Sequence, residues 1–155
     1  MNKNDLIIKL NNLQKNHINK LSVYKINVKK KNKGSIGEQL TRNFLQQHNI
    51  IFTEQKTFND LKDKDFLRYD FYIFYKNKNM LLECDGLQHN KPVDFSGHLS
   101  DDEVQANFEK NKYHDKLKNE YAKNHNIPLY RISWNGNKKQ YLNELRKLFL
   151  SMIEV

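Results

Sequence analysis

The sequence has a single cysteine, few arginines and no long apolar run. Cys84 stands alone among the 155 residues, which excludes an intramolecular disulfide and a cysteine-rich zinc site. A lone cysteine also suits a reducing compartment. No apolar run approaches the length that crosses a membrane, and no signal-peptide pattern is present. We therefore expect an intracellular protein that is not secreted and does not bind a membrane.

Lysine dominates the basic residues and is concentrated at one end of the chain. Only four of the 27 basic residues are arginine, and residues 1–33 hold nine Lys and one Asp, a net charge of +8 out of a total of +9. Such a basic arm is typical of proteins that bind a polyanion, most commonly nucleic acid. Coding bias toward Lys and Asn is the alternative explanation. The candidate phosphate contacts in this arm are Lys29, Lys30, Lys31 and Lys33.

The remaining residues are sufficient for one folded domain. Hydrophobic residues make up 37% of the chain and aromatic residues 12%, enough for a core in a domain of this length. We expect a basic N-terminal helix or arm at 1–33 and a folded domain at 34–155. Periodicity predicts helices at 4–21, 35–48, 101–124 (in one or two pieces) and 140–152, and strands at 50–58, 67–75, 79–85 and 129–134. The segments 59–64 and 86–99 are expected to be loops.

This order of elements predicts an α/β fold with an αβββαβ core, in which helices flank a mixed sheet. Two helix starts have the spacing of a capping box, with Ser35 three residues before Glu38 and Ser100 three residues before Glu103.

The strands at 67–75 and 79–85 form a predicted hairpin whose two faces differ. Side chains alternate across a strand, so one face gathers seven apolar or aromatic residues: Tyr69, Phe71, Ile73, Tyr75, Met80, Leu82 and Cys84. Pairing Asp70 with Glu83 or with Asp85 keeps this arrangement, whereas a slip of one residue places acids in the core. Burial alone therefore predicts that Asp70, Glu83 and Asp85 converge on the opposite face.

Three carboxylates so close together repel one another unless shared protons or a divalent cation compensate. Ligands that are all oxygen favour Mg²⁺ or Mn²⁺ over zinc. The alternative is that the acids are solvated strand ends. An acid such as Glu83 directly after Leu81 and Leu82 is, however, costly in an apolar strand unless it has a partner or a function.

At these residues the sequence resembles the PD-(D/E)XK nuclease superfamily. It is most similar to the branch of very-short-patch-repair endonucleases and of homing-type or free-standing endonucleases from phages and large viruses. The resemblance covers about residues 34–150, and the matching segments are Gly37-Glu38, Tyr69-Asp70-Phe71-Tyr72, Leu82-Glu83-Cys84-Asp85-Gly86-Leu87-Gln88-His89, Lys91-Pro92-Val93-Asp94-Phe95, Gly97, Asp115, Lys118-Asn119-Glu120-Tyr121, Asn126-Ile127 and Leu129-Tyr130-Arg131-Ile132.

The resemblance implies a restriction-endonuclease-like core and a set of residue roles. Asp70 matches the first acidic motif, and Glu83-Cys84-Asp85 matches the Asp/Glu-x-Lys motif, with Asp85 where the Lys is expected. Related branches share this departure and carry a Gln-His pair downstream, here Gln88-His89. The implied ligands of Mg²⁺ (or Mn²⁺) are Asp70, Glu83 and the backbone carbonyl of Cys84, with Asp85 binding a second ion or orienting water. The acid of the N-terminal helix corresponds to Glu38.

Several of these residues also have an ordinary structural explanation. Glu38 completes a capping box without any catalytic role. His89 has a pKa that suits a general acid or base, but it is equally explained as a hydrogen-bonded loop histidine, so the general base stays open. Asp115 and Lys118 have the spacing of a helical ion pair. Cys84 is expected to be a buried, inert thiol. Candidate phosphate contacts in the domain are Arg68, Lys118 and Arg131.

The sequence thus predicts a metal-dependent DNA endonuclease that leaves 5′-phosphate ends, the polarity being implied by the resemblance. A DNA-binding module that keeps the fold without cleaving is the main alternative, because the motif lacks its Lys. An RNA-processing nuclease ranks lowest, since no RNA-recognition motif is visible. A homodimer is expected if both strands are cut, because one site cuts one strand.

Overall fold

A computed structural model describes residues 34–86, 91–94 and 96–151 of the chain. These residues belong to a compact unit that spans Gly34–Val155. The helix predicted at 4–21 and the basic arm at 1–33 lie outside the described residues.

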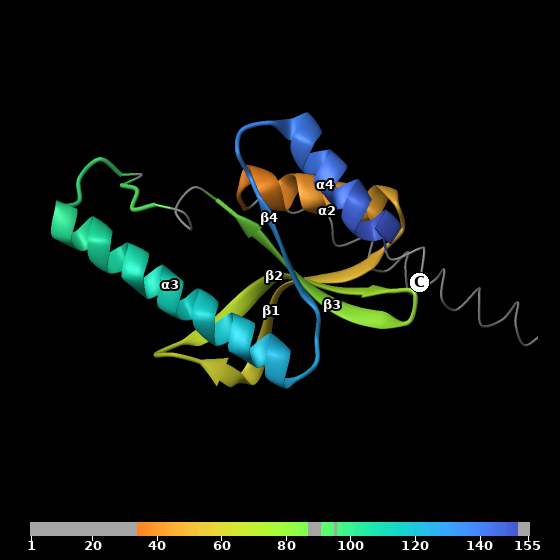
Figure 1. The fold of residues 1–155 in the computed structure, drawn as a ribbon, viewed down its shortest axis with the longest axis horizontal. Coiled ribbons are helices and arrows are strands. Elements are labelled where there is room, and N and C mark those ends of the chain that lie inside the picture. Colours follow the sequence, from red (N-terminus) through yellow and green to blue (C-terminus); the bar gives the residue numbers. More distant parts are fainter. Residues whose placement is uncertain (1–33, 87–90, 95, 152–155) are drawn as a thin grey trace, which may run out of the picture. The chain divides into compact units, whose positions relative to one another are not determined.

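The described chain forms an α/β fold in which helices flank a four-stranded mixed sheet (Figure 1). The elements are α2 (Ile36–Gln47), β1 (Ile51–Lys62), β2 (Phe66–Tyr75), β3 (Lys78–Asp85), α3 (Asp101–Asn124), β4 (Leu129–Ser133) and α4 (Lys138–Ser151). The sheet order is β1-β2-β3-β4; the first two pairings are antiparallel and the β3–β4 pairing is parallel. The predicted α/β class, with a mixed sheet between helices, is confirmed.

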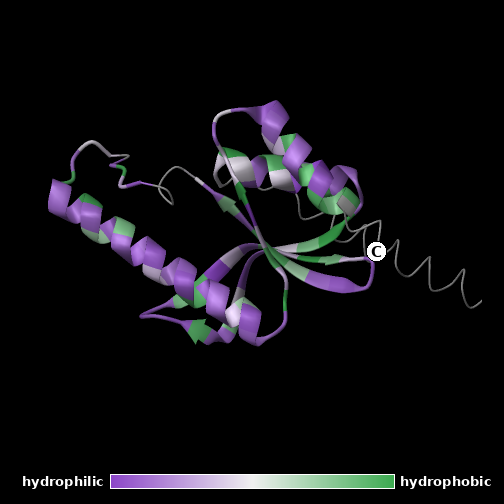
Figure 2. Ribbon diagram, viewed as in Figure 1, coloured by the Kyte–Doolittle hydropathy of each residue, from purple (hydrophilic) through white to green (hydrophobic). Residues whose placement is uncertain are grey.

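The two faces of the sheet are covered by different helices, which creates two apolar clusters. Helices α2 and α4 pack on one face around Phe71, Ile73 and Leu82. Helix α3 covers the other face, where Leu81 and Ala122 are buried. In Figure 2 most of α3 is coloured hydrophilic, as expected of a helix that buries one narrow side. Both faces of β3 are therefore inside the protein.

The β1–β2 hairpin is longer than the pattern predicts. The segment 59–64 was expected to be a loop, which is wrong for residues 59–62: β1 continues to Lys62, which pairs with Phe66. Leu61 in this segment is buried in the α3 cluster. One side of the strand end therefore packs against the protein, and this burial outweighs the polar composition of the segment.

Tyr69 does not share a face with Phe71, contrary to the predicted alternation. It is fully buried in the α3 cluster, whereas Phe71 lies in the α2–α4 cluster. The pairing of β2 with β3 runs from Tyr75↔Lys78 to Phe71↔Leu82. Gln55 of β1, between the partners of Phe71 and Tyr69, has a left-handed φ of 50°. The backbone of β1 is thus irregular opposite Asp70, and Leu67 and Tyr69 in the first half of β2 pack in the α3 cluster.

Both predicted capping boxes are confirmed. Ser35 and Glu38 exchange side-chain and backbone hydrogen bonds at the start of α2, and Ser100 and Glu103 do so at the start of α3. Helix α3 is one continuous element of 24 residues. Within the described part of the chain, no helix has the length and apolar character needed to cross a membrane.

Candidate active site

Asp70 lies where the β2–β3 pairing ends, and its side chain accepts a hydrogen bond from the backbone of β3. The backbone N–H of Cys84, two residues beyond Leu82, donates to Asp70 Oδ2 at 2.7 Å, and Asp70 is one residue beyond Phe71. Continuing that register places Asp70 opposite Glu83, one of the two pairings that the sequence allows. Burial raises the pKa of Asp70 against this hydrogen bond, and the charge of Glu38 raises it further.

Glu83 is a nearly inaccessible carboxylate, with 3% of its surface exposed. Burial raises its pKa to about 7, and the nearby charge of Asp70 adds to this, while Lys118 opposes it. Glu83 Oε2 accepts a hydrogen bond from Lys118 Nζ at 2.7 Å. Its other oxygen, Oε1, is buried and has no hydrogen-bond partner among the described residues. A buried carboxylate oxygen without a donor is short of positive charge.

Lys118 reaches Glu83 because α3 is fixed at this residue. The hydroxyl of Tyr69 donates to the Lys118 carbonyl at 2.7 Å, and Lys118 Nζ lies 5.7 Å from the centre of the Tyr69 ring. The two side chains of the ion pair are 13% and 4% exposed. The helical spacing of Asp115 and Lys118 allowed an ion pair between them, but each side chain instead reaches a separate strand residue.

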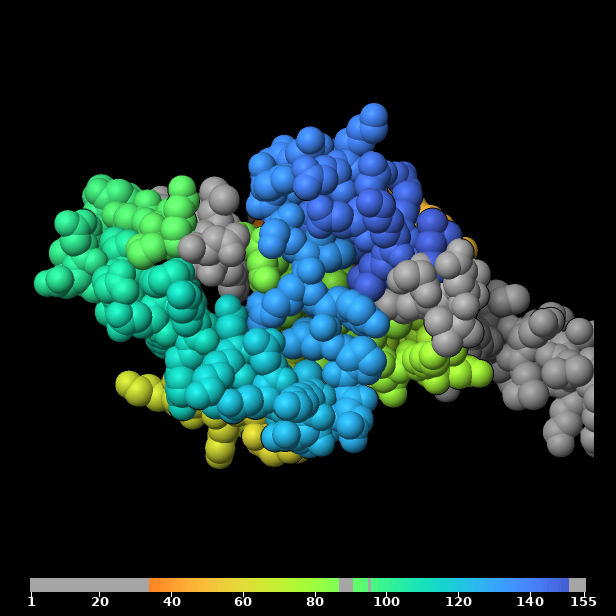
Figure 3. All heavy atoms as spheres, in the orientation of Figure 1, coloured from red at the N-terminus to blue at the C-terminus, as the bar shows by residue number. Residues whose placement is uncertain are grey.

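Asp85 belongs to a chain of ion pairs that crosses from β3 to α3. Arg131 of β4 donates through Nη1 to Asp85 Oδ1 at 2.9 Å and through Nη2 to Asp115 Oδ1 at 3.1 Å. The parallel register places Arg131 beside Glu83. Figure 3 shows α3 (teal) and β4 (blue) side by side on this face of the molecule. The predicted phosphate contact Arg131 is thus engaged by two carboxylates.

The expected convergence of three carboxylates is met only in part. Asp70 and Asp85 influence each other electrostatically, as do Asp70 and Glu83. Yet within residues 34–86, 91–94 and 96–151, no three His, Cys, Asp or Glu side chains group closely enough to hold a metal ion. Arg131 binds Asp85 and gives that carboxylate a partner within the protein. The pair Asp70 and Glu83 remains.

Glu38 combines its capping role with a place near Asp70. Its side chain accepts the Ser35 N–H at 3.2 Å, and its charge raises the pKa of Asp70. Gly37 allows this approach: a Cβ there would lie 3.2 Å from the Tyr141 hydroxyl oxygen and 3.4 Å from the Cys84 Cβ. The absence of a side chain at Gly37 therefore lets α2 pack directly against the strand that carries the site.

Two polar residues beneath the site were missed by the sequence reasoning. Thr41 Oγ1 lies 2.9 Å from the Tyr141 hydroxyl oxygen and 3.4 Å from Cys84 Sγ, all three groups being buried. Burial raises the pKa of the Cys84 thiol to about 12, so the expected inert thiol is supported. A sequence signal existed: Gly37 and Thr41 are one helical turn apart, so a small and a hydroxyl residue share the buried face of α2.

The other predicted site residues are either exposed or lie outside the described residues. Arg68 is exposed on β2, where a phosphate contact is sterically possible. Gln88, His89 and the four lysines Lys29, Lys30, Lys31 and Lys33 lie outside the described residues.

Asp70, Glu83 and the Cys84 carbonyl are the groups at this site whose chemistry suits a hard divalent cation. All three donors are oxygen, and Glu83 Oε1 has no partner in the described chain. Mg²⁺ typically takes one or two carboxylates and completes its shell with water and substrate phosphates, so a third acidic ligand is not required. Comparisons of the chain with protein-family models, with curated proteins and with solved structures found no match.

Proposed function

We propose that this protein is a metal-dependent DNA endonuclease built on a restriction-endonuclease-like core. The observation that carries the proposal is the carboxylate pair Asp70 and Glu83 at the end of the β2–β3 pairing. Both pKa values are raised, and one buried oxygen of Glu83 has no donor among the described residues. Perturbed, neighbouring carboxylates of this kind cluster at functional sites. The αβββαβ element order and the sequence resemblance support the same conclusion.

Asp70, Glu83 and the Cys84 carbonyl would hold Mg²⁺ or Mn²⁺. When bound, such an ion lowers the pKa of a water and neutralises charge on the phosphate. The residues themselves orient the site. The Cys84 N–H fixes one oxygen of Asp70 at 2.7 Å, and Lys118 fixes one oxygen of Glu83, so each carboxylate presents its second oxygen in a set direction.

Lys118 supplies the cation that the motif lacks at Asp85. Hydrolysis adds a water oxygen to phosphorus and breaks the bond to the leaving oxygen, and negative charge develops on the phosphate as this happens. The Lys118 ammonium sits beside Glu83 in a largely buried position, where its charge is weakly screened. We assign it to stabilise that developing charge. Asp85 forms an ion pair with Arg131, which links β3 to β4 beside the site.

A DNA-binding module without cleavage is the second candidate. The observation in its favour is that Lys118 and Arg131 already pair with Glu83 and Asp85 within the protein. If these ion pairs are permanent, the acids serve stability, and the basic residues elsewhere bind DNA.

The test is cleavage of supercoiled plasmid by the full chain in Mg²⁺, Mn²⁺ or EDTA. The variants are Asp70→Asn and Glu83→Gln, which keep side-chain shape, with Glu120→Gln as the matched control on the exposed side of α3. We expect metal-dependent nicking or linearisation that falls at least about a hundredfold in both site variants and stays unchanged in the control.

Each other outcome points away from the proposal. DNA binding in a gel shift without cleavage by the wild type supports the binding module. Cleavage that survives both site variants, or that persists in EDTA, shows that Asp70 and Glu83 are not the catalytic pair. If the folded wild-type protein neither binds nor cleaves DNA, both candidate functions are contradicted.

A further inference from the structure

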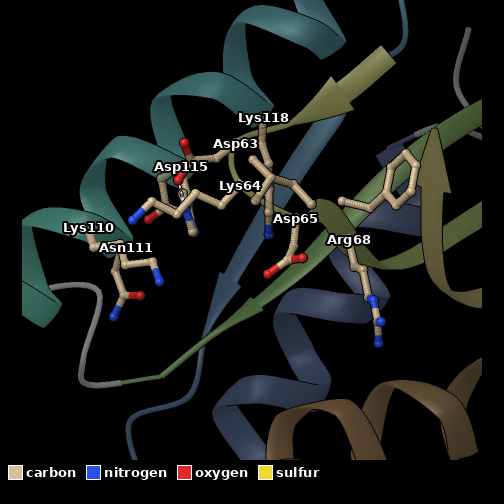
Figure 4. Close-up of a pocket in the computed structure, with 11 residues that line it drawn as sticks. Asp63, Lys64, Asp65, Arg68, Lys110, Asn111, Asp115 and Lys118 are labelled. Carbon is tan, nitrogen blue, oxygen red and sulfur yellow. Dashed lines mark hydrogen bonds and ion pairs between the residues drawn. The ribbon is translucent and has the colours of Figure 1, made fainter. Parts of the chain in front are cut away.

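A groove of about 300 Å³ lies between the turn joining β1 to β2 and one side of α3. It is lined by residues 63–68 and by Lys110, Asn111, His114, Asp115 and Lys118. Figure 4 shows the turn residues facing α3 across this groove. Its inner end adjoins the candidate active site, because Lys118 contacts Glu83 there.

Two of the three acidic residues that line this groove have a partner within the protein. Asp63 Oδ2 lies 3.1 Å from His114 Nε2, and Asp115 pairs with Arg131 as described above. Asp65 is the third carboxylate that lines the groove.

The basic residues of the groove are mostly uncommitted. Lys64, Arg68 and Lys110 form no ion pair within the described residues, whereas Lys118 is held by Glu83. The groove lining holds four cationic side chains against three carboxylates, and Asp115 is already paired with Arg131, so the groove has an excess of positive charge that attracts an anion. The cations come from both walls, which suits a ligand that carries charge along its length, such as a phosphodiester strand.

Phe66 adds an aromatic surface to the same groove. Its side chain is 54% exposed, although phenylalanine is usually buried. An exposed aromatic ring among unpaired cations is the combination that single-stranded nucleic acid uses, since bases stack on the ring while phosphates meet the cations.

We propose that this groove binds an unpaired nucleotide of a DNA strand and leads that strand to Asp70 and Glu83. The identity of the ligand rests on the proposed function. A volume of about 300 Å³ is at the lower end of small-ligand pockets and suits one nucleotide. A volume of this size encloses one unpaired nucleotide and not a base-paired segment. The preferred substrate therefore contains a single-stranded segment.

The test is binding of the full chain in EDTA, which separates binding from cleavage. Fluorescence anisotropy compares a labelled single-stranded oligonucleotide with a duplex of the same sequence over a range of salt concentrations. The groove variants are Phe66→Ala, Arg68→Ala and Lys110→Ala. The matched controls are Phe74→Ala, an exposed aromatic outside the groove, and Lys147→Ala, an exposed lysine of α4.

We expect Phe66→Ala to weaken single-strand binding at least about fivefold, because one stacked base is lost. Arg68→Ala and Lys110→Ala should each lower the slope of log Kd against log salt by about 0.7. Duplex binding, which the basic N-terminal residues can support, should change less than twofold, and so should all binding by the controls.

The inference is overturned if groove and control variants weaken binding equally, if duplex and single strand are affected alike, or if the wild type binds no single strand. These results are distinct from failure of the proposed function. Plasmid cleavage with unaffected groove variants leaves the nuclease standing and removes the groove. Groove-dependent binding without any cleavage keeps the groove and removes the catalysis.

Discussion

Replacing Glu83 with Gln should stabilise the protein at pH 8 and change it little at pH 5. Glu83 is buried, and burial raises its pKa from an ordinary 4.5 to about 7. Glutamine keeps the shape of the side chain and an acceptor for Lys118 Nζ, but it carries no charge. The variant therefore removes the cost of ionising a carboxyl group inside the protein.

The magnitude follows from the difference between the two pKa values. Because the folded protein holds the Glu83 proton more tightly than the unfolded chain, the contribution of Glu83 to stability is greatest below pH 4.5. It then falls as the pH rises to 7. A difference of about 2.5 pKa units corresponds to about 3 kcal/mol at 1.36 kcal/mol per unit. From pH 5 to pH 8, the advantage of Glu83→Gln should grow by about 2 to 3 kcal/mol, or about 5 to 10 °C in Tm.

The assay is urea unfolding in EDTA at several pH values, followed by the fluorescence of Trp134. A second series contains Mg²⁺. Mg²⁺ binds the ionised form of Glu83, which predominates at pH 8. A Mg²⁺ concentration ten times its Kd should therefore stabilise the wild type by about 1.4 kcal/mol at pH 8. The Glu83→Gln variant should gain much less from the metal.

The reasoning is refuted if the stability difference between Glu83→Gln and wild type stays constant from pH 5 to pH 8. The control is Glu120→Gln on the exposed surface of α3, which should change stability by less than about 0.5 kcal/mol at every pH. A metal effect of equal size in wild type and Glu83→Gln would separately contradict the assignment of Glu83 as a ligand.

Three further changes test other contacts. Lys118→Met should abolish plasmid nicking and cost about 3 kcal/mol at pH 8, with a smaller loss at pH 6 where Glu83 can take up a proton; urea unfolding at both pH values checks this. Tyr141→Phe should cost about 1 to 2 kcal/mol by removing the buried hydrogen bond to Thr41, and an unchanged urea midpoint would contradict it. Ser100→Ala should cost about 1 kcal/mol through loss of the α3 cap, measured as a lower thermal midpoint by circular dichroism.

The local order of this fold follows from the sequence because its signals are local. Helix caps at Ser35 and Ser100 depend on residues three positions apart, and both are present as predicted. The register of the β2–β3 hairpin follows from alternation across neighbouring strands, and Phe71↔Leu82 agrees with it. The position of Asp70 relative to Glu83 could thus be anticipated.

The alternation failed where the sheet stops being regular. Tyr69 turns to α3 at the point where β2 leaves β3, and nothing in the local pattern of β2 marks that point. The strand at 59–62 was missed for a similar reason. Three of its four residues are polar, and the burial of Leu61 under α3 and the pairing with β2 make the segment a strand.

The sequence by itself determined that Asp70 and Glu83 lie on neighbouring strand positions, and the tertiary structure decided which of the carboxylates have partners. Lys118 is 35 residues from Glu83 in the chain, and Arg131 is 46 residues from Asp85. These contacts form because Tyr69 of β2 hydrogen-bonds the backbone of α3 at Lys118, and because β4 pairs with β3 in parallel. Contacts over such separations depend on how whole elements pack, and no periodicity within one element encodes them.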